Sequence, residues 1–283
     1  MKRIFPTHPI EEPVIENPWQ RLRDFTDARI GLGRAGISVP TKHLLAFQLA
    51  HAQAIDAVHT PLDIDGLIEN LMSQSWCPKG QPLRLHSRAE HRDMYLQRPD
   101  YGRLLNKTSE QTLEDHAYLC DDEYDLAFVI VDGLSAFAIE ENVAPFLEEL
   151  IPQLTNGPEP WRIAPLCLVE QGRVAIGDHI GDLLKAKCVV VLVGERPGLS
   201  SPDSMGLYLT WSPKVGHTDA FRNCISNIRT AGLNYPEAAR KALYLLNEAR
   251  SKQLSGVKLK DRTDDSVLEH ENDNNNFLIT QKP

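Results

Sequence analysis

The chain has 283 residues, of which 42% are hydrophobic and 24% are charged. These shares are close to the globular averages of about 45–50% and about 25%, which excludes a chain that is fibrous or disordered throughout. The 30 basic and 39 acidic residues give a net charge of −9, which argues against a general binder of nucleic acid or of anionic membranes.

The first half of the chain is expected to be an extended arm followed by helices. Residues 1–18 carry four prolines and no apolar run of the kind found in a secretory signal. Apolar residues then recur at helical spacing over residues 19–30 and 42–58, with Thr41 as the expected N-cap of the second helix. Asp63 or Asp65 is expected to begin a short third helix. We therefore predict a helical docking region over residues 19–124.

The second half of the chain has a different pattern of apolar residues. Short apolar runs at residues 126–131, 164–169 and 188–193 alternate with helical intervals, which is typical of a parallel sheet covered on both faces. Another strand at residues 207–211 and an amphipathic helix at residues 236–254 follow. We predict a Rossmann-like, mostly parallel α/β domain over residues 125–260. No stretch of the chain reaches the roughly 18 apolar residues that would span a membrane.

The end of the chain and its cysteines complete this outline. Residues 261–283 hold six acids and two bases and are expected to form a disordered acidic tail. The cysteines are too far apart in sequence for a zinc knuckle, a redox motif or a disulfide framework, so we expect reduced thiols in a cytosolic protein and no metal site. They are Cys77, Cys120, Cys167, Cys188 and Cys224.

Gly31, Gly33 and Gly36 match the glycine spacing of a dinucleotide-binding loop. That loop needs a buried strand before it and a helix that begins inside it. Here a charged helical segment precedes the glycines and Pro40 follows them. A turn is therefore the better interpretation.

Ser135 follows a predicted strand and precedes a predicted helix, as the nucleophile of a hydrolase does, with Asp203 and His217 in the right chain order. Phe137 occupies the place where a nucleophile elbow needs a small residue. Ser135 is more simply interpreted as the N-cap of the following helix, and a serine hydrolase remains an alternative.

Three loops follow the predicted strands at residues 132–135, 170–174 and 194–203. The carboxyl ends of strands in open α/β sheets are where ligands bind, above all where the strand order reverses. These loops are therefore candidates for a ligand site, with ordinary connections as the alternative.

Several long runs in both halves of the chain are unusual enough to indicate a family. In the second half they are GRVAIGDHIGDLL (172–184), VVVLVGERPGLSSPDSMGLYLTW (189–211) and TDAFRNCISNIR (218–229), and in the first half RLRDFTDARIGLGRAGISVPT (21–41), HAQAIDAVH (51–59) and SRAEHRDMYLQRPDYGRLL (87–105). They resemble the small, or light, subunit of ethanolamine ammonia-lyase. The resemblance spans residues 19–260.

The resemblance implies a subunit of an adenosylcobalamin-dependent lyase that converts ethanolamine to acetaldehyde and ammonia by radical chemistry. It implies a hetero-oligomer in which the large subunit holds the substrate and the small subunit completes the cobalamin site at the interface. This chain is then expected to carry no catalytic residue and no metal ligand. The implied location is the cytoplasm, within a bacterial microcompartment, and nucleic acid and membranes are not expected partners.

Position by position, the family's cobalamin contacts fall on Val174, Glu195 and Cys224 of this sequence. Glu195 is expected to accept hydrogen bonds from the amides at the rim of the corrin, Val174 to supply apolar contact, and Cys224 to pack without binding cobalt. His179 departs from the family pattern, which has an acidic residue there, and is expected to alter the surface only. A cobalamin-binding or assembly protein without a catalytic role remains the second alternative.

Overall fold

The computed structural model describes residues 17–26, 28–119 and 123–261. Most of the expected N-terminal arm, Cys120 and nearly all of the expected acidic tail lie outside these ranges, so those expectations stay predictions. Within these ranges, none of the helices is long and apolar enough to cross a membrane.

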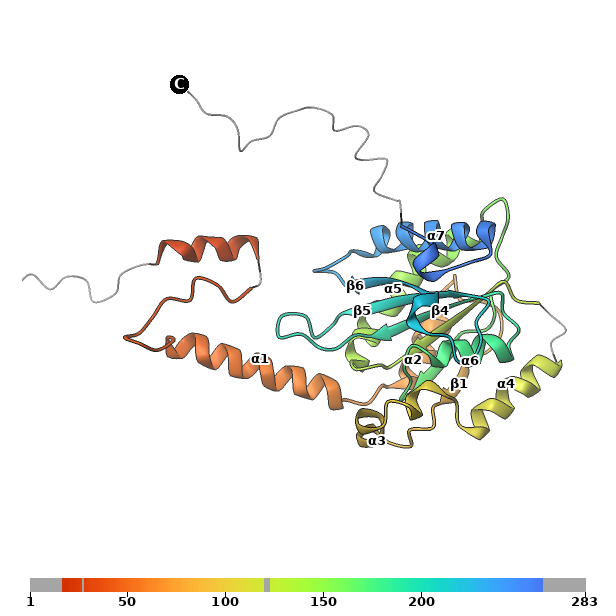
Figure 1. Ribbon diagram of the computed structural model, residues 1–283, viewed down its shortest axis with the longest axis horizontal. Coiled ribbons are helices and arrows are strands. Elements are labelled where there is room, and N and C mark those ends of the chain that lie inside the picture. Colours follow the sequence, from red (N-terminus) through yellow and green to blue (C-terminus); the bar gives the residue numbers. More distant parts are fainter. Residues whose placement is uncertain (1–16, 27, 120–122, 262–283) are drawn as a thin grey trace, which may run out of the picture.

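A six-stranded mixed sheet with the order β1-β3-β2-β4-β5-β6 forms the centre of the body (Figure 1). The strands are β1 (Leu83–His86), β2 (Leu126–Val131), β3 (Cys167–Glu170), β4 (Cys188–Gly194), β5 (Met205–Trp211) and β6 (Arg222–Ile228). The first four strands in this order are parallel, whereas β5 and β6 are antiparallel to their neighbours. The predicted α/β class is confirmed, and the Rossmann-like parallel arrangement is limited to β1, β3, β2 and β4.

Helices cover the sheet on both faces. On one face lie α2 (Ile64–Ser73), α5 (Ala136–Thr155) and α7 (Tyr235–Lys252), and on the other α4 (Lys107–Leu119) and α6 (Ile176–Leu183). Successive side chains of β2 point to opposite faces of the sheet. Phe128 packs toward the first set of helices and Val129 toward the second. Every residue of β2 and of β4 is buried, as expected for strands with both faces covered.

The N-terminal helical region extends away from this body (Figure 1). We call residues 17–26 and 28–59 the projecting segment. It contains the 3-10 helix η1 (Pro18–Phe25) and the long helix α1 (Thr41–His59). Only Ala57 of α1 is buried, and Phe25 and Leu49 are 87% and 60% exposed. The predicted helical region is confirmed, although its first helix is a 3-10 helix.

The remaining connections are short. Helix α3 (Arg92–Gln97) and the 3-10 turns η2 (Tyr101–Arg103), η3 (Asp219–Phe221) and η4 (Gly256–Lys258) link the larger elements. Asp63 caps α2 by accepting a hydrogen bond from the Gly66 N–H at 3.1 Å, as predicted. Thr41 is not a cap, because α1 begins at Thr41 itself after Pro40, with no side-chain capping bond.

Strands β1 and β6 were not predicted from the sequence. Strand β1 is only four residues long and mixes Leu with Arg84 and His86, and most residues of β6 are polar, so that it has no continuous apolar run. Strand β1 lies within residues 19–124, for which helices were predicted, yet it pairs with β3 at the edge of the sheet. Long-range pairing, which the local sequence pattern does not report, makes both segments strands.

Candidate functional site

The carboxyl ends of β2, β3 and β4 lie at one edge of the sheet. The chain passes from β2 to its neighbour β3 and then crosses to β4 on the other side of β2, so the strand order reverses between β2 and β4. Ligands of open α/β sheets bind at such a switch point. The three loops expected from the sequence, at residues 132–135, 170–174 and 194–203, all begin at this edge.

Backbone contacts close the crevice between the ends of β2 and β4. The Leu134 N–H donates a hydrogen bond to the Gly194 carbonyl at 2.9 Å. Gly133 has a φ of +59°, and a Cβ atom on Gly133 or Gly194 would overlap backbone atoms of the facing segment. The two strand ends therefore leave no gap between them, and their residues Gly133, Leu134 and Gly194 form one wall of a pocket that extends to β5.

Tyr208 on β5 is the side chain around which Val174, Glu195 and Cys224 meet. Tyr208, Val174 and Glu195 line a pocket of about 390 Å³, and Tyr208 and Val174 also line an adjoining pocket of about 730 Å³. Across the β5–β6 ladder, Tyr208 is paired with Cys224. Burial and the Cys224 thiol raise the pKa of the Tyr208 phenol. The structure thus brings the three expected residues to one surface.

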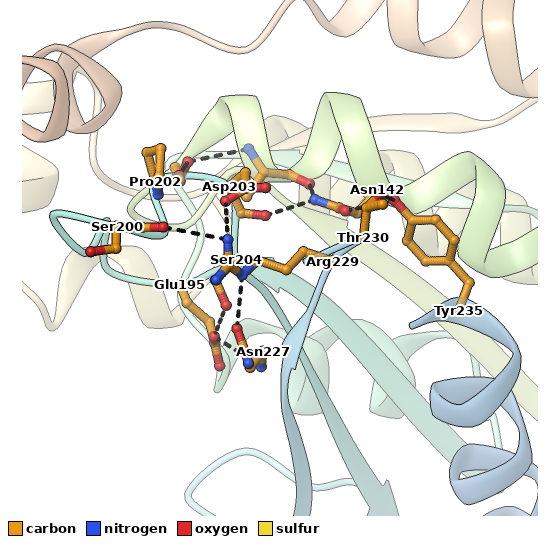
Figure 2. A network of polar contacts seen from close by, with 12 residues as sticks. Asn142, Glu195, Ser200, Pro202, Asp203, Ser204, Asn227, Arg229, Thr230 and Tyr235 are labelled. Atoms are coloured by element: carbon orange, nitrogen blue, oxygen red, sulfur yellow. Dashed lines mark hydrogen bonds and ion pairs between the residues drawn. The ribbon is translucent and has the colours of Figure 1, made fainter. Parts of the chain in front are cut away.

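Glu195 follows β4 directly, and its carboxylate is held through one oxygen (Figure 2). Oε2 accepts hydrogen bonds from the Ser204 hydroxyl at 2.5 Å and from the Asn227 N–H at 3.2 Å. The other oxygen, Oε1, lies 2.9 Å from where a Cβ atom of residue 206 would stand, and that residue is Gly206. A larger residue at 206 would displace the carboxylate. Gly206 therefore leaves the space that the Glu195 side chain occupies.

Val174 is positioned by the buried carboxylate of Asp132 at the end of β2. Asp132 accepts hydrogen bonds from the N–H groups of Gln171 at 2.9 Å and Gly172 at 3.1 Å, and thereby fixes the loop that leads to Val174. Arg92 lies 3.5 Å from the same carboxylate. Burial raises the pKa of Asp132 to about 6, against the lowering effect of these N–H groups and of Arg92.

Cys224 is exposed, and its strand is tied to α6 by a buried ion pair. Arg222, two residues before Cys224, pairs with Asp178 of α6, and both side chains are 2% exposed. Arg222 also donates to the Thr218 carbonyl at 2.7 Å. Burial raises the pKa of Asp178 to about 6 although Arg222 opposes that rise. The pair fixes β6 relative to the helix that follows Val174.

Arg173 adds a positive charge beside Val174. Its guanidinium carbon lies 4.4 Å from the centre of the Tyr95 ring, and Arg92 lies 4.7 Å from the same ring. Arg173 also donates to the Tyr95 carbonyl at 3.0 Å. Both pockets that contain Val174 are lined by Arg173. Arg173 was not expected at this site, although it directly precedes Val174 in the sequence.

His179 is not the surface residue that the sequence analysis expected. Its Nδ1 atom accepts a hydrogen bond from the Leu105 N–H at 3.3 Å, and its Nε2 atom lies 3.8 Å from a Glu110 oxygen of α4. Burial lowers the pKa of His179 below its usual value. The residue therefore bridges α6 to the segment around α4, and the expectation of a surface change was wrong.

Ser135 caps α5, as expected. Its Oγ atom accepts a hydrogen bond from the Ala138 N–H at 3.2 Å and donates one to the Pro202 carbonyl at 2.8 Å. Ser135 is fully buried. The two proposed partners are engaged elsewhere, because Asp203 pairs with Arg229 at 3.2 Å and His217 stacks on the Phe221 ring at 4.4 Å. This arrangement does not support a serine nucleophile.

The chemistry that this surface offers is that of a binding site. Around Tyr208 it presents a carboxylate oxygen, a phenol, a thiol and an apolar side chain, which suit a ligand with both N–H groups and apolar area. Among residues 17–26, 28–119 and 123–261, no group of three or more His, Cys, Asp or Glu side chains is arranged to hold a metal ion.

The loops were expected from the sequence, but Tyr208, at the centre of the surface, was not. The available signal was the polar alternation in residues 206–210, where Tyr208 and Thr210 separate apolar neighbours. Ser204 and Asn227, which hold Glu195, were not expected either. Nothing in the local sequence shows that these residues face Glu195.

Comparison with known proteins identifies the family. The family described as Ethanolamine ammonia-lyase light chain (EutC) matches residues 16–260. An ethanolamine ammonia-lyase small subunit of Pseudomonas aeruginosa is 53% identical over 267 residues, which are 94% of this chain and 96% of the relative. Small subunits of Pseudomonas fluorescens and Pseudomonas putida are each 52% identical, over 275 residues (96% and 97%) and 270 residues (94% and 97%). The chain therefore belongs to the ethanolamine ammonia-lyase light-chain family, the small subunits of this lyase.

Proposed function

We propose that this chain completes an adenosylcobalamin site at an interface with the large subunit of ethanolamine ammonia-lyase, and that the assembled hetero-oligomer converts ethanolamine to acetaldehyde and ammonia. The observation that carries the proposal is the convergence of Val174, Glu195 and Cys224 around Tyr208. These three positions come from three different segments of the chain, and family resemblance singled them out independently of the fold.

The residues at this surface fit the chemistry of a corrin. Both hydrogen bonds that Glu195 accepts from described residues end on Oε2, so Oε1 remains as an acceptor for an amide N–H at the corrin rim. Val174 adds apolar contact beside it. Cys224 and Ser226 are exposed, and Tyr208 is half-buried, on the same face of the β5–β6 hairpin. The exposed part of this face lies on β6, beside the pocket that Tyr208, Val174 and Glu195 line.

The projecting segment supports a large partner. Leu44, Leu45 and Leu49 of α1 are all exposed, which leaves apolar area on a helix that contacts the body mainly at one end (Figure 1). Exposed apolar surface of this extent marks interaction sites in soluble proteins. A small subunit implies a larger one, and we propose that the large subunit covers α1.

The role of this chain in the reaction is to bind and orient. When bound, adenosylcobalamin supplies radical chemistry through homolysis of its cobalt–carbon bond, and that chemistry belongs to the cofactor. Glu195 accepts a hydrogen bond, Val174 excludes water from one side, and the buried pairs Asp132–Arg92 and Asp178–Arg222 keep the contributing segments in place. Substrate chemistry then falls to the large subunit.

The test is a cofactor titration of the reconstituted enzyme. Glu195→Ala should raise the adenosylcobalamin concentration for half-maximal deamination about tenfold, because a hydrogen bond to a charged group contributes about 1.5–3 kcal/mol. Glu248→Ala, which removes a carboxylate on the exposed face of α7 paired with Lys252, is the matched control and should leave that concentration unchanged.

Two outcomes would contradict the proposal. The first is full deamination by the large subunit alone. The second is an unchanged half-maximal cofactor concentration in Glu195→Ala with the complex intact by gel filtration. A requirement for this chain without any effect of Glu195→Ala would instead favour the alternative of an assembly protein.

We further propose that the complex is located in a bacterial microcompartment in the cytoplasm. This proposal rests on the family resemblance. Fusing residues 1–18 to a fluorescent protein, in cells that make the compartment, tests whether this stretch directs the chain there. A diffuse signal for the fusion and for the full chain would contradict the proposed location.

A further inference from the structure

The segment that carries Glu195 lies between two arginines. It connects β4 to β5 and spans residues 195–204. Arg29 of the projecting segment donates to the Leu199 carbonyl at 3.2 Å from one side. Arg229, at the end of β6, contacts the segment from the other side, and its side chain is 11% exposed. A buried guanidinium needs several acceptors, because leaving its N–H groups unpaired costs free energy.

Arg229 finds those acceptors on two different segments (Figure 2). Its Nη1 atom pairs with the Asp203 carboxylate at 3.2 Å and lies 3.5 Å from the Ser200 carbonyl. Its Nε atom donates to the Asn227 side-chain oxygen at 3.0 Å. Two of these contacts hold the 195–204 segment, and the third holds the strand that faces it.

The same two segments supply both donors to Glu195. Ser204 directly follows Asp203, and its hydroxyl donates to Oε2. The Asn227 N–H donates to the same oxygen, and Asn227 has a φ of +62°, in the left-handed region that few non-glycine residues adopt. The Arg229 contact with the Asn227 side chain opposes relaxation of that backbone. Other bonds also hold these segments, such as the one from the Asn142 side chain to the Asp203 carbonyl at 2.8 Å. Among these contacts, Arg229 is the side chain that reaches both the segment of Ser204 and the side chain of Asn227.

We infer that Arg229 is a positioning residue for the Glu195 carboxylate, acting through Asp203 and Asn227 without a contact of its own to the ligand. The inference rests on the proposed function, since it assumes that Glu195 binds the cofactor. This role requires the planar guanidinium of Arg229, which reaches two segments at once. A lysine ammonium cannot do so in the same geometry.

A double-mutant cycle in the reconstituted enzyme tests the inference. Arg229→Gln should raise the adenosylcobalamin concentration for half-maximal deamination about fivefold. The displaced Glu195 carboxylate should bind the amide of the cofactor more weakly, by about 1 kcal/mol. The kcat at saturating cofactor should stay within about twofold, because no reacting atom is touched. In the Glu195→Ala background, Arg229→Gln should cause no further rise.

Two further variants separate positioning from general stability. Asn227→Gly keeps the N–H that Glu195 needs and tolerates the positive φ, but it removes the acceptor of Arg229. It should raise the half-maximal cofactor concentration by about twofold to threefold, less than Arg229→Gln does. Arg240→Gln, which breaks an exposed ion pair with Glu237 on α7, is the matched control and should leave it unchanged.

The outcomes distinguish this inference from the proposed function. If Glu195→Ala raises the half-maximal concentration but Arg229→Gln and Asn227→Gly do not, Arg229 does not position Glu195 and only the inference fails. Equal fold-changes for Arg229→Gln with and without Glu195 would also overturn it. If Glu195→Ala itself has no effect, the proposed cofactor contact fails first. Should Arg229→Gln not fold, the cycle between Asn227→Gly and Glu195→Ala decides the question.

Discussion

The four parallel strands and the β5–β6 hairpin share one sheet but differ in what covers them. Strands β2 and β4 are buried along their whole length between helices on both faces. The hairpin packs its Leu207, Leu209 and Ile225 side against α7, while Cys224 on its other side is exposed. We therefore expect a division of roles, in which the parallel strands contribute most of the stability and the Cys224 side of the hairpin contributes to the proposed binding surface.

The largest expected difference between the two regions comes from truncating one aromatic side chain in each. Phe128→Ala in β2 should lower the free energy of unfolding by about 3–5 kcal/mol, since Phe128 is fully buried. Tyr208→Ala in β5 should lower it by only about 1 kcal/mol but raise the half-maximal cofactor concentration of the reconstituted enzyme. Urea denaturation followed by circular dichroism measures the first quantity. Equal losses of stability for the two variants would contradict the division.

Asp132 follows the buried strand β2 and holds the loop that leads to Val174. It allows a test of how stability depends on pH. Its pKa is raised to about 6 by burial from an ordinary value of 3.8, so the folded chain binds more protons than the unfolded chain between these values. The stability that this group contributes is therefore present below about pH 4 and is lost as the pH rises through about 6.

Urea denaturation of the wild type and of Asp132→Asn across this range measures the effect. The difference in the free energy of unfolding, wild type minus variant, should fall as the pH rises from about 4 to about 6 and then level off. Asp125→Asn provides a comparison of opposite sign, because hydrogen bonds and Lys187 hold the pKa of Asp125 below its ordinary value. A difference that stays constant for Asp132 would show that burial does not govern its protonation.

Ser135→Ala should have the smallest effect. Loss of the N-cap of α5 should lower the free energy of unfolding by about 1 kcal/mol. The kcat for deamination at saturating cofactor and ethanolamine should stay within about twofold, whereas removal of a catalytic nucleophile costs several orders of magnitude. An ammonia-release assay of the reconstituted enzyme decides between these outcomes, and a collapse of kcat with the fold intact would contradict a purely capping role for Ser135.

The parts of the fold that could be predicted are those in which local sequence and tertiary structure agree. Residues 126–131 and 188–193 are continuous apolar runs, and both became buried strands of the parallel sheet. The position of the loops at one edge followed from the rule for parallel strands. In contrast, β6 reads as a polar segment, and only its pairing with β5 makes it a strand.

The site could be predicted in part for the same reason. The resemblance pointed to Glu195, but the way that residue is held depends on contacts that no local pattern reports. Asn227 lies 32 residues away along the chain and reaches Glu195 through a backbone N–H, which every residue except proline possesses. The role of Asn227 follows from its φ and its neighbours, and those exist only in the folded chain.

The antiparallel direction of β5 affects access to the hairpin. A parallel successor to β4 would have needed a crossover, usually a helix, lying over one face of the sheet. The chain instead returns through residues 195–204 and leaves the Cys224 side of the hairpin accessible. On the proposed function, the large subunit covers this face from outside, so the time for which the cofactor stays bound depends on the contact between the two subunits.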